Sequence, residues 1–506
     1  MDQENTLKRL YEKQLSLSGS DSPLEKIGRA FFKKGSLPAS IVTQLVAFSE
    51  SQLNKKSPWD HLETWRELLS LALMTHLDAA YDPHRNEIKE SFQNYPKDYF
   101  WKEFQLSSAL SNLISALVDL PINLPAIHQL QNGAVPLEFG GHWTWGEIPH
   151  LRHQAELGIY WALLGIKYEN AEYLAAAEKI AEWQLNSLDY HFYPFVGLFV
   201  QEADAALCAL LCDQYLLFSL LAILKSSSRM AYAAKRQLGY LEHSVLSTQV
   251  RISVIAPLLE EYIHKLGESP VPIPFGLPQS IHDVDTALIG VRAEEKSLVC
   301  TGFGGRTGLG SLHFDDLQLI SYGPQHLPLG DCRGFGVEGG RYSVKTVVMQ
   351  ADHAHKGSFL IQHQARLSAK PVYSTSSPLF RNGQRCQAWL DLKQEFKHDY
   401  LSLDARFFGD TPKELAFTFF VKAKSCTIQE TRKVLPRTLD HYQSSPGAIL
   451  LSGETQQFSI ETPHRHGEMQ VIPLGGGDNF WGADFLIAYL FDFHSTAAYT
   501  WQINLT

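Results

Sequence analysis

The chain of 506 residues has few cysteines, no surplus of basic residues and no long apolar run. Of its 6 cysteines, only Cys208 and Cys212 are close together, at the i,i+4 spacing of a helix within an apolar pattern. No second cysteine pair or nearby histidine completes a set of four ligands, so these two residues indicate buried free thiols and not a zinc site. So sparse a use of cysteine is typical of a reducing compartment.

Charge and hydrophobicity exclude further classes of protein. The formal net charge of -10 leaves no basic surplus to neutralise phosphates, which disfavours nucleic acid as a partner. The longest apolar run, Leu216–Leu224, is interrupted by Ser219 and is too short to cross a bilayer, so it predicts a buried helix and no membrane partner. The segment Met1–Asn5 is polar and acidic and lacks the features of a secretory signal, so we expect a cytoplasmic location.

The composition is that of a globular protein, with 44% hydrophobic and 19% charged residues. From Leu7 to about His264, apolar residues return at three- and four-residue steps, which predicts roughly ten helices joined by short connections. Ser22 and Asn170 are predicted helix N-caps, and Gly165 is predicted to end a helix. Because no repeat of fixed period occurs, a closed or incomplete (α/α) toroid is favoured over a regular solenoid.

A proline-rich segment, Ser269–Pro278, marks a change of pattern. Repeated prolines exclude a helix and favour an extended connection. Beyond it the apolar period becomes two, and more than ten short strands without intervening helices imply antiparallel sheets packed as a sandwich. The sequence therefore predicts an α+β multidomain chain, with a helical toroid domain over 1–268, a linker over 269–279 and an antiparallel β-sandwich domain over 280–506.

Two loops of the helical part combine aromatic rings with polar side chains. The first, Asn132–Glu147, contains His142, Trp143 and Trp145, and the second is Leu188–Gly197. The tryptophans alternate along an extended stretch, so either one ring stacks on a sugar while the other anchors the loop, or both rings pack inside the protein. Both loops are two helices apart in sequence, so antiparallel alternation predicts that they lie at the same end of the helical domain. His150 and His153 follow one helical turn apart, and a solvated face is predicted for His153.

A helical toroid joined by a proline-rich segment to an antiparallel sandwich resembles the polysaccharide lyases of the heparinase II/III and chondroitinase AC or alginate lyase type. The resemblance covers most of the chain. In the heparinase II/III group, the sandwich contributes a histidine near a short segment with His, Asp and Phe. Gly308–Leu317, with His313, and Asp352–Phe359, with His355, are similar to it. The resemblance implies a lyase that performs β-elimination on an acidic, uronate-containing glycan in a cleft between toroid and sandwich.

Such a lyase removes the C5 proton beside a carboxylate whose charge has been neutralised, and then protonates the leaving oxygen. Tyrosine and histidine serve as base and acid, and no cofactor or metal is needed. A metal site at His353 and His355 would also want a glutamate shortly after, which is lacking. The candidate catalytic residues are Tyr193, Tyr190, His142, His191, His313 and His355. The candidate substrate-binding residues are Trp143, Trp145, Glu147 and Asn132.

Two other functions fit the same architecture. A toroid glycoside hydrolase would use two carboxylates, with Glu147 and either Glu202 or Asp204 as candidates. A non-catalytic glycan-binding or scaffold protein would keep the fold without the chemistry. The partner in all three cases is a poly- or oligosaccharide, and the reaction products separate them. A lyase creates an unsaturated sugar that absorbs in the near ultraviolet, a hydrolase creates only new reducing ends, and a binding protein creates neither.

The domain division is tested by limited proteolysis. We expect a protease to cut first within 269–279, because an extended proline-rich connection has few backbone hydrogen bonds to protect it. Circular dichroism of the separated products should show helix in the N-terminal piece and β-structure in the C-terminal piece. Substantial helix in the C-terminal piece would contradict the predicted boundary.

Overall fold

The structure is a computed structural model of the chain. The residues that it describes are 6–17, 22–34, 37–38, 40–52, 58–94, 105–135, 151–195, 204–248, 252–283, 288–301, 310–326, 335–338, 341–344, 347–348, 360–363, 372–381, 384–397, 399–411, 415–438, 441–474, 483–493 and 498–506.

The described chain forms two compact units. The helical unit contains the described residues up to 135 together with 151–185 and 208–275. The strand-rich unit contains those from 276 onward, and also the described residues of 186–207, which interrupt the helical sequence. The unit boundary between Phe275 and Gly276 falls inside the proline-rich segment. The limits that we predicted for independently folding domains stay a prediction.

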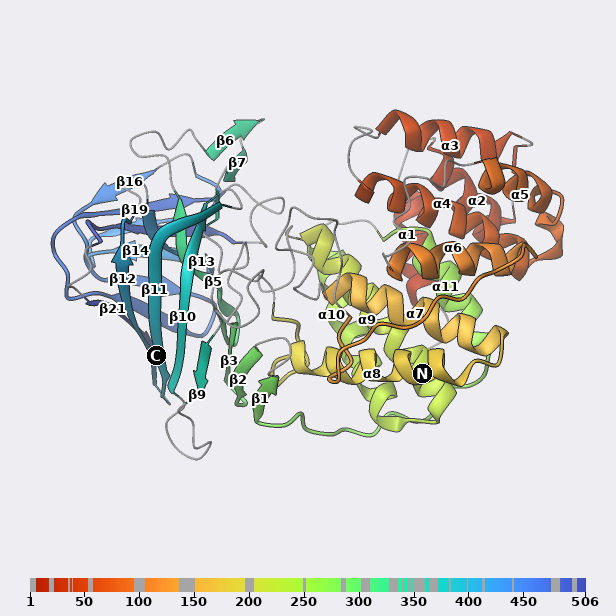
Figure 1. Ribbon diagram of the computed structural model, residues 1–506. Helices are drawn as coiled ribbons and strands as arrows, with labels where there is room; N and C mark the ends of the chain where they lie inside the picture. The colour runs from red at the N-terminus through yellow and green to blue at the C-terminus, as the bar shows by residue number, and fades with distance from the viewer. Residues whose placement is uncertain are drawn as a thin grey trace. The chain divides into compact units, whose positions relative to one another are not determined.

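The helical unit is built from helices whose neighbours in sequence are often neighbours in space (Figure 1). They are α1 (Thr6–Leu17), α2 (Pro23–Lys33), α3 (Ile41–Gln52), α4 (Pro58–Leu77), α5 (His84–Asn94), α6 (Gln105–Leu117), α7 (Leu151–Lys167), α8 (Ala171–Gln184), α9 (Asp204–Lys225), α10 (Ser228–Thr248) and α11 (Ile255–His264). Helix α7 packs on α6 and α8, and α4 packs on α6 and α11. Closure of these helices into a toroid stays a prediction.

Local sequence explains several helix ends. The Ser22 side chain accepts a hydrogen bond from the Glu25 amide, and Pro23 lies in the first turn of α2. The Asn170 side chain accepts from the amides of Glu172 and Tyr173 at the start of α8. Both predicted N-caps are confirmed. The prediction that Gly165 ends a helix is wrong, because α7 continues to Lys167. A β-carbon at Gly165 would lie 2.8 Å from Leu174 Cγ, so this glycine allows α8 to approach α7 closely.

Helix α9 contains the longest apolar stretch of the chain. Residues 207–225 are long and apolar enough to cross a membrane, yet 72% of the most apolar window is buried inside the structure. This burial is typical of the core helix of a folded domain, as predicted for the run 216–224. Cys208 and Cys212 on the same helix are buried free thiols, which confirms their interpretation.

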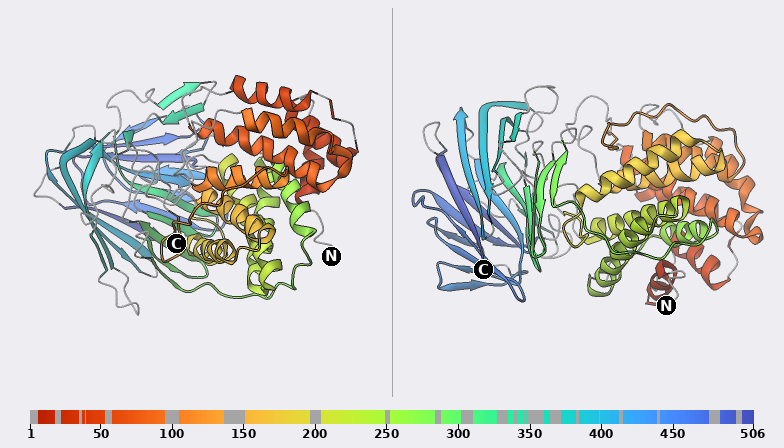
Figure 2. Two further views of the ribbon diagram at one scale, coloured as in Figure 1. Left: turned by 45° about the vertical axis from the view of Figure 1, so that its right-hand side comes forward. Right: turned by 90° about the horizontal axis from the view of Figure 1, so that it is seen from below.

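The strand-rich unit consists of two large antiparallel sheets and a separate hairpin (Figure 2). The first sheet has the order β1 (Ser280–Asp283), β2 (Leu288–Arg292), β3 (Lys296–Thr301), β4 (Gly310–Phe314), β5 (Leu317–His326), β13 (Leu415–Lys422), β20 (Phe485–Leu490), β19 (Glu468–Pro473) and β16 (Tyr442–Ser444), with β8 (Val347–Val348) also beside β5. The second has the order β15 (Arg432–Val434), β14 (Ser425–Ile428), β17 (Ile449–Ser452), β18 (Gln457–Glu461), β21 (Ala498–Leu505), β12 (Tyr400–Gly409), β11 (Gln384–Phe396), β10 (Val372–Arg381) and β9 (Leu360–His363). The hairpin pairs β6 (Phe335–Glu338) with β7 (Arg341–Val344). A helical N-terminal part followed by antiparallel sheets confirms the predicted order of structure.

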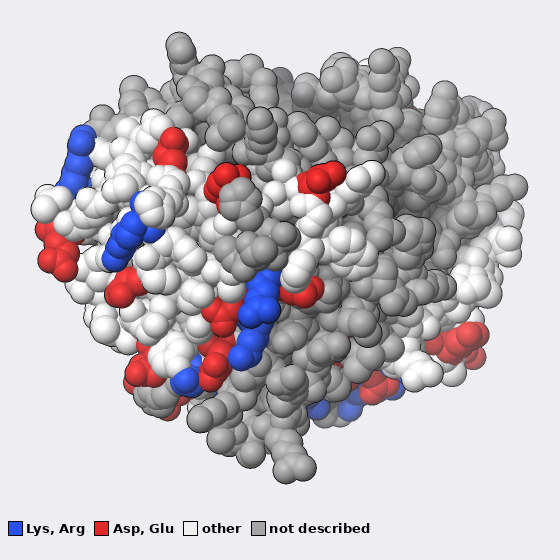
Figure 3. Space-filling view, turned by 60° about the vertical axis from the view of Figure 1, so that its left-hand side comes forward, with Lys and Arg blue, Asp and Glu red and all other residues white. Residues whose placement is uncertain are grey.

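Charged side chains of both signs are mixed over the described part of the face in Figure 3. Exposed ion pairs such as Lys424–Glu454, at 2.7 Å, belong to this kind of surface. A mixed surface carries no strong field of one sign, which agrees with the absence of a basic surplus in the sequence.

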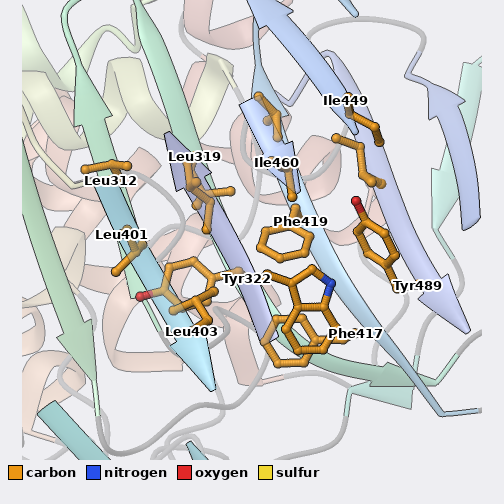
Figure 4. Close-up of a cluster of buried hydrophobic side chains, with 14 of the residues drawn as sticks. Leu312, Leu319, Tyr322, Leu401, Leu403, Phe417, Phe419, Ile449, Ile460 and Tyr489 are labelled. Carbon is orange, nitrogen blue, oxygen red and sulfur yellow. The ribbon is translucent and has the colours of Figure 1, made fainter. Parts of the chain in front are cut away.

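The core of the strand-rich unit lies between the two sheets, where side chains of both interdigitate (Figure 4). Phe417 of the first sheet stacks on Trp501 of the second, with ring centroids 4.1 Å apart and an interplanar angle of 18°. Along β12 the burial alternates with a period of two, which places Leu401 and Leu403 in this core. Burial of this aromatic and aliphatic layer stabilises the sandwich.

Gly310 offers a sharp test of this packing. A β-carbon at Gly310 would lie 2.0 Å from the hydroxyl oxygen of Tyr322, whose ring is fully buried. We expect Gly310→Ala to lower the free energy of unfolding by about 1–3 kcal/mol through overpacking. Gly239→Ala is the control, because no atom lies within 4 Å of its added β-carbon in α10 and alanine favours the helix by about 1 kcal/mol. Equal stability of the two variants in chemical denaturation would contradict the tight packing at Gly310.

Candidate functional site

The candidate site is a tight loop, Ser187–Phe195, that belongs to the strand-rich unit. The loop closes as a small hairpin, in which the amide of Asp189 donates to the Tyr193 carbonyl at 2.8 Å and the amide of Phe195 donates to the Ser187 carbonyl at 3.0 Å. Phe192 at its tip has a φ of +69°, a strained value for a bulky residue. The Asp189 side chain supports this turn, because its Oδ1 accepts from the amides of His191 and Tyr193, each at 2.8 Å.

The loop is held to strands β2 and β3 and to the turn between them. The amide of Tyr190 donates to the Ser297 hydroxyl at 3.1 Å, and the His191 ring contacts the carbonyl oxygen of Glu294 through Nε2. Arg292 Nε donates to the Leu188 carbonyl at 2.6 Å, and its Nη1 donates to the Pro278 carbonyl at 2.8 Å. These contacts join the loop to the first sheet of the sandwich through both backbone and side-chain groups.

Arg292 also supplies positive charge near the loop. Its side chain is buried, and burial lowers the pKa of its guanidinium to about 10 while the nearby Asp189 carboxylate opposes that shift. The guanidinium therefore remains protonated at neutral pH. A buried carboxylate needs such compensation, because an isolated buried charge is costly.

The second oxygen of Asp189 meets a histidine from strand β4. Asp189 Oδ2 and His313 Nδ1 are 3.3 Å apart, and both side chains are less than 10% exposed. The His313 ring packs against Phe195 and Tyr193, with centroid distances of 4.8 and 5.7 Å. Its Nε2 is buried and has no hydrogen-bond partner among the described residues. In the neutral ring, an Nδ1–H that donates to the carboxylate leaves Nε2 as a proton acceptor.

Tyr193 packs against this buried pair and remains partly accessible. Its ring is half-buried, whereas the His313 ring against it is buried. Tyr190 is 37% exposed, and its ring contacts that of His191 at a centroid distance of 5.2 Å. The loop therefore presents two phenols, of which only Tyr193 contacts the buried Asp189–His313 pair.

The structure brings together four of the predicted catalytic residues, Tyr190, His191, Tyr193 and His313. Asn132 lies in the helical unit, where its Oδ1 accepts from the Ala134 amide at 2.9 Å and shapes a turn. Several predicted residues lie outside the described residues: His142, Trp143, Trp145, Glu147, Glu202 and His355. The shared end of the two loops and the cleft between toroid and sandwich stay predictions. Within the described residues, no group of three or more His, Cys, Asp or Glu side chains could hold a metal ion.

Two residues of the site, Asp189 and Arg292, were not predicted from the sequence, and the exposure predicted for His153 is wrong. Asp189 could have been found from its place two and four residues before His191 and Tyr193, which suits a carboxylate that caps a turn. Arg292 has no local signal, because its partner Leu188 is 104 residues away. The solvated face predicted for His153 is wrong: this side chain is buried, because α7 packs between α6 and α8.

The comparisons with known proteins concern the fold. No family model matches the chain, and no curated protein matches it. Among solved structures, a Paenibacillus xanthan lyase is similar over 100% of this chain and 54% of its own, with 12% identity and a TM-score of 0.52. The chondroitin AC lyase of Streptomyces coelicolor A3, in complex with chondroitin sulphate, is similar over 99% of this chain and 74% of its own, with 11% identity and a TM-score of 0.46.

The chain thus spans about half the length of the xanthan lyase whose fold it shares. This likeness confirms the architectural resemblance to polysaccharide lyases. The heparinase II/III part of the resemblance stays a prediction, and so do the roles of individual residues. At 12% identity, a shared fold identifies neither the substrate nor the reaction.

The loop attachment can be tested through Asp189. Replacing it by alanine leaves two loop amides and the buried His313 without their acceptor, so Asp189→Ala should lower the free energy of unfolding by about 3–5 kcal/mol. Chymotrypsin should then cut the native protein faster after Tyr190 or Phe192. Asp410→Ala, at an exposed position, is the control and should change neither quantity. Unchanged cleavage in Asp189→Ala would show that this carboxylate does not hold the loop.

Proposed function

We propose that this protein is a polysaccharide lyase that performs β-elimination on an acidic, uronate-containing glycan. The observation that carries the proposal is the contact of Tyr193 with the buried Asp189–His313 pair on a fold shared with a xanthan lyase. β-Elimination needs a group that takes or gives a proton near neutral pH without a cofactor, and a held phenol can do both. In this mechanism, side chains of the protein itself transfer the protons.

In this proposal Tyr193 is the catalytic acid/base, and His313 is a positioning residue. His313 is only 4% exposed, so a polymer cannot reach it directly. Its ring contacts the Tyr193 ring, while Asp189 fixes the His313 ring orientation and also binds the Tyr193 amide. Asp189 therefore positions both the backbone and the ring environment of Tyr193. Such fixed geometry is what makes proton transfer efficient.

The neutralisation of the uronate carboxylate falls to other residues. Arg292 is buried and its described hydrogen bonds go to the carbonyls of Leu188 and Pro278, so it supports the loop. In the first loop, His142 keeps its predicted catalytic role and Glu147 its predicted place in substrate binding, with Trp143 and Trp145 as stacking rings. A neutral histidine or a protonated acid can offset the carboxylate charge that hinders removal of the C5 proton.

A non-catalytic glycan-binding protein is the second candidate, and burial of His313 favours it. A buried Asp–His pair can serve only to fasten a loop, and the exposed ring of Tyr190 then acts as a sugar-stacking surface. The hydrolase candidate has weaker support, because the Asp189 carboxylate of this loop already binds two amides and a histidine. Reaction products separate the three candidates.

The catalytic role is tested by Tyr193→Phe, which removes only a hydroxyl. We expect turnover on a cleaved uronate polymer to fall by about two to four orders of magnitude, with binding largely retained. The readout is the near-ultraviolet absorbance of the unsaturated product, from a panel that includes xanthan and chondroitin sulphate. Tyr190→Phe should reduce turnover less, and Tyr168→Phe, at an exposed position in the helical unit, should not change it.

The possible results separate the candidates. Full activity in both Tyr193→Phe and Tyr190→Phe would remove the proposed mechanism. New reducing ends without ultraviolet absorbance would identify a hydrolase. Binding of a polymer without any product would leave the glycan-binding protein as the function.

A further inference from the structure

The helical unit contains a second cluster of ionisable groups, which the proposed lyase site does not use. It lines a cavity of about 100 Å³ between α7, α9 and the start of α11. Arg152, Glu156 and Tyr160 come from α7, and Cys208, Cys212 and Asp213 come from α9. The rest of the wall is mostly apolar and is made by Ile159, Ala209, Ile252, Ser253, Ile255, Ala256 and Leu259. The cavity wall therefore combines charged groups from α7 and α9 with apolar side chains, most of which come from residues 252–259.

The charged groups form a network of two arginines and two carboxylates. Arg66 of α4 bonds Glu156 at 2.6 Å, with both side chains less than 10% exposed. Arg152 reaches Glu156 at 3.5 Å and Asp213 at 3.1 Å. Arg152 and Asp213 are partly exposed, at 27% and 14%. Arg152 therefore lies between the buried ion pair and the accessible part of the cavity, and it is shared by two carboxylates.

The balance of charge in this network favours an anion as ligand. Burial, aided by the neighbouring Glu156, raises the pKa of Asp213 to about 7 against the opposing effect of Arg152 and Arg66. Burial raises the pKa of Tyr160 and of Cys212, so both stay neutral at pH 7. Because Asp213 is about half protonated at pH 7, the positive charge of the two arginines exceeds the negative charge of the two carboxylates. The cluster therefore repels a cation.

The size and shape of the cavity limit the ligand further. A closed apolar cavity of about 150 Å³ accommodates benzene. The smaller cavity between α7, α9 and α11, of about 100 Å³, therefore suits a ligand of about four to six non-hydrogen atoms. The apolar wall around Ile252, Ala256 and Leu259 suits a short hydrocarbon chain. Arg152 offers the planar guanidinium that recognises a carboxylate. We propose that this cavity binds a short-chain aliphatic monocarboxylate, with its carboxylate on Arg152 and its chain against Ile252 and Leu259.

Binding of such an anion is coupled to a proton. The ligand carboxylate replaces Asp213 on Arg152, and Asp213 then takes up a proton, because its ion-pair partner is engaged. The bound form therefore has the higher pKa at Asp213. Affinity is constant below the pKa of the free protein, near 7, and falls about tenfold for each pH unit above it. Arg152, Arg66, Glu156, Tyr160, Cys208 and Cys212 are the ionisable groups around Asp213 that remain unchanged in this step.

Titration calorimetry of the full chain with butyrate tests the proposal. We expect binding at pH 6 and 7, about tenfold weaker binding at pH 8, and uptake of up to one proton above pH 7, read from buffers with different ionisation heats. Butyramide has the same shape without charge, and butylamine carries the opposite charge, so neither should bind. Butyramide that binds as well as butyrate, or butyrate that does not bind at all, would overturn the proposal. Glucuronate distinguishes a sugar acid, which is too large, from an aliphatic acid.

Three variants place the binding at this cavity. Arg152→Gln should abolish butyrate binding, whereas Arg9→Gln, which removes an arginine that is 74% exposed, should not affect it. Asp213→Asn should retain binding and lose its dependence on pH. Ala209 lines the cavity and is partly exposed, so Ala209→Ile should fill the cavity and abolish butyrate binding without preventing folding. This variant therefore tests the location of the binding site even if Arg152→Gln does not fold. Binding unchanged in Ala209→Ile, or unchanged pH dependence in Asp213→Asn, would contradict the proposal. None of these residues belongs to the lyase site, so the two proposals can fail independently.

Discussion

One buried carboxylate holds the candidate site together. Asp189 combines two loop amides on one oxygen with His313 on the other. Its carboxylate also lies close enough to Arg292 to oppose the lowering of the guanidinium pKa by burial. Burial of a charge without such partners costs several kcal/mol, so this loop can take its conformation only on this sheet. The same bonds fix the amide of Tyr193 and the ring against which Tyr193 packs. Attachment and presentation of the phenol are therefore consequences of one interaction.

The order of structure along the chain could be predicted because it depends on local periodicity. Apolar spacing shows where helices give way to strands, and the caps at Ser22 and Asn170 follow from short-range side-chain chemistry. Antiparallel pairing follows because no helix is available to connect parallel strands. Alternation along two strands is enough to predict that Phe417 and Trp501 are buried. It does not predict that their two rings stack on each other.

The site was predicted less completely because it depends on contacts between distant residues. Tyr193 and His313 were chosen separately for their chemistry, and only the fold brings them together across 120 residues of chain. Asp189 meets His313 across 124 positions, and no periodicity encodes such a pair. Gly165 and His153 were misjudged for a related reason. Each was interpreted from its own helix, whereas neighbouring helices decide whether a glycine permits close approach or a histidine is covered.

Two carboxylates of this protein, Asp189 and Asp213, show how partners decide what an acid can do. Asp189 meets backbone amides, which cannot move away without unfolding the loop, so its bonds serve structure. Asp213 depends on one arginine that it shares with Glu156, and its pKa near 7 shows that this compensation is incomplete. An acid bound by fixed donors positions its neighbours, whereas an acid bound by a shared side chain can exchange its partner for a ligand. Asp189 is therefore suited to hold the loop of the candidate site, and Asp213 is suited to the proton-coupled binding that we propose.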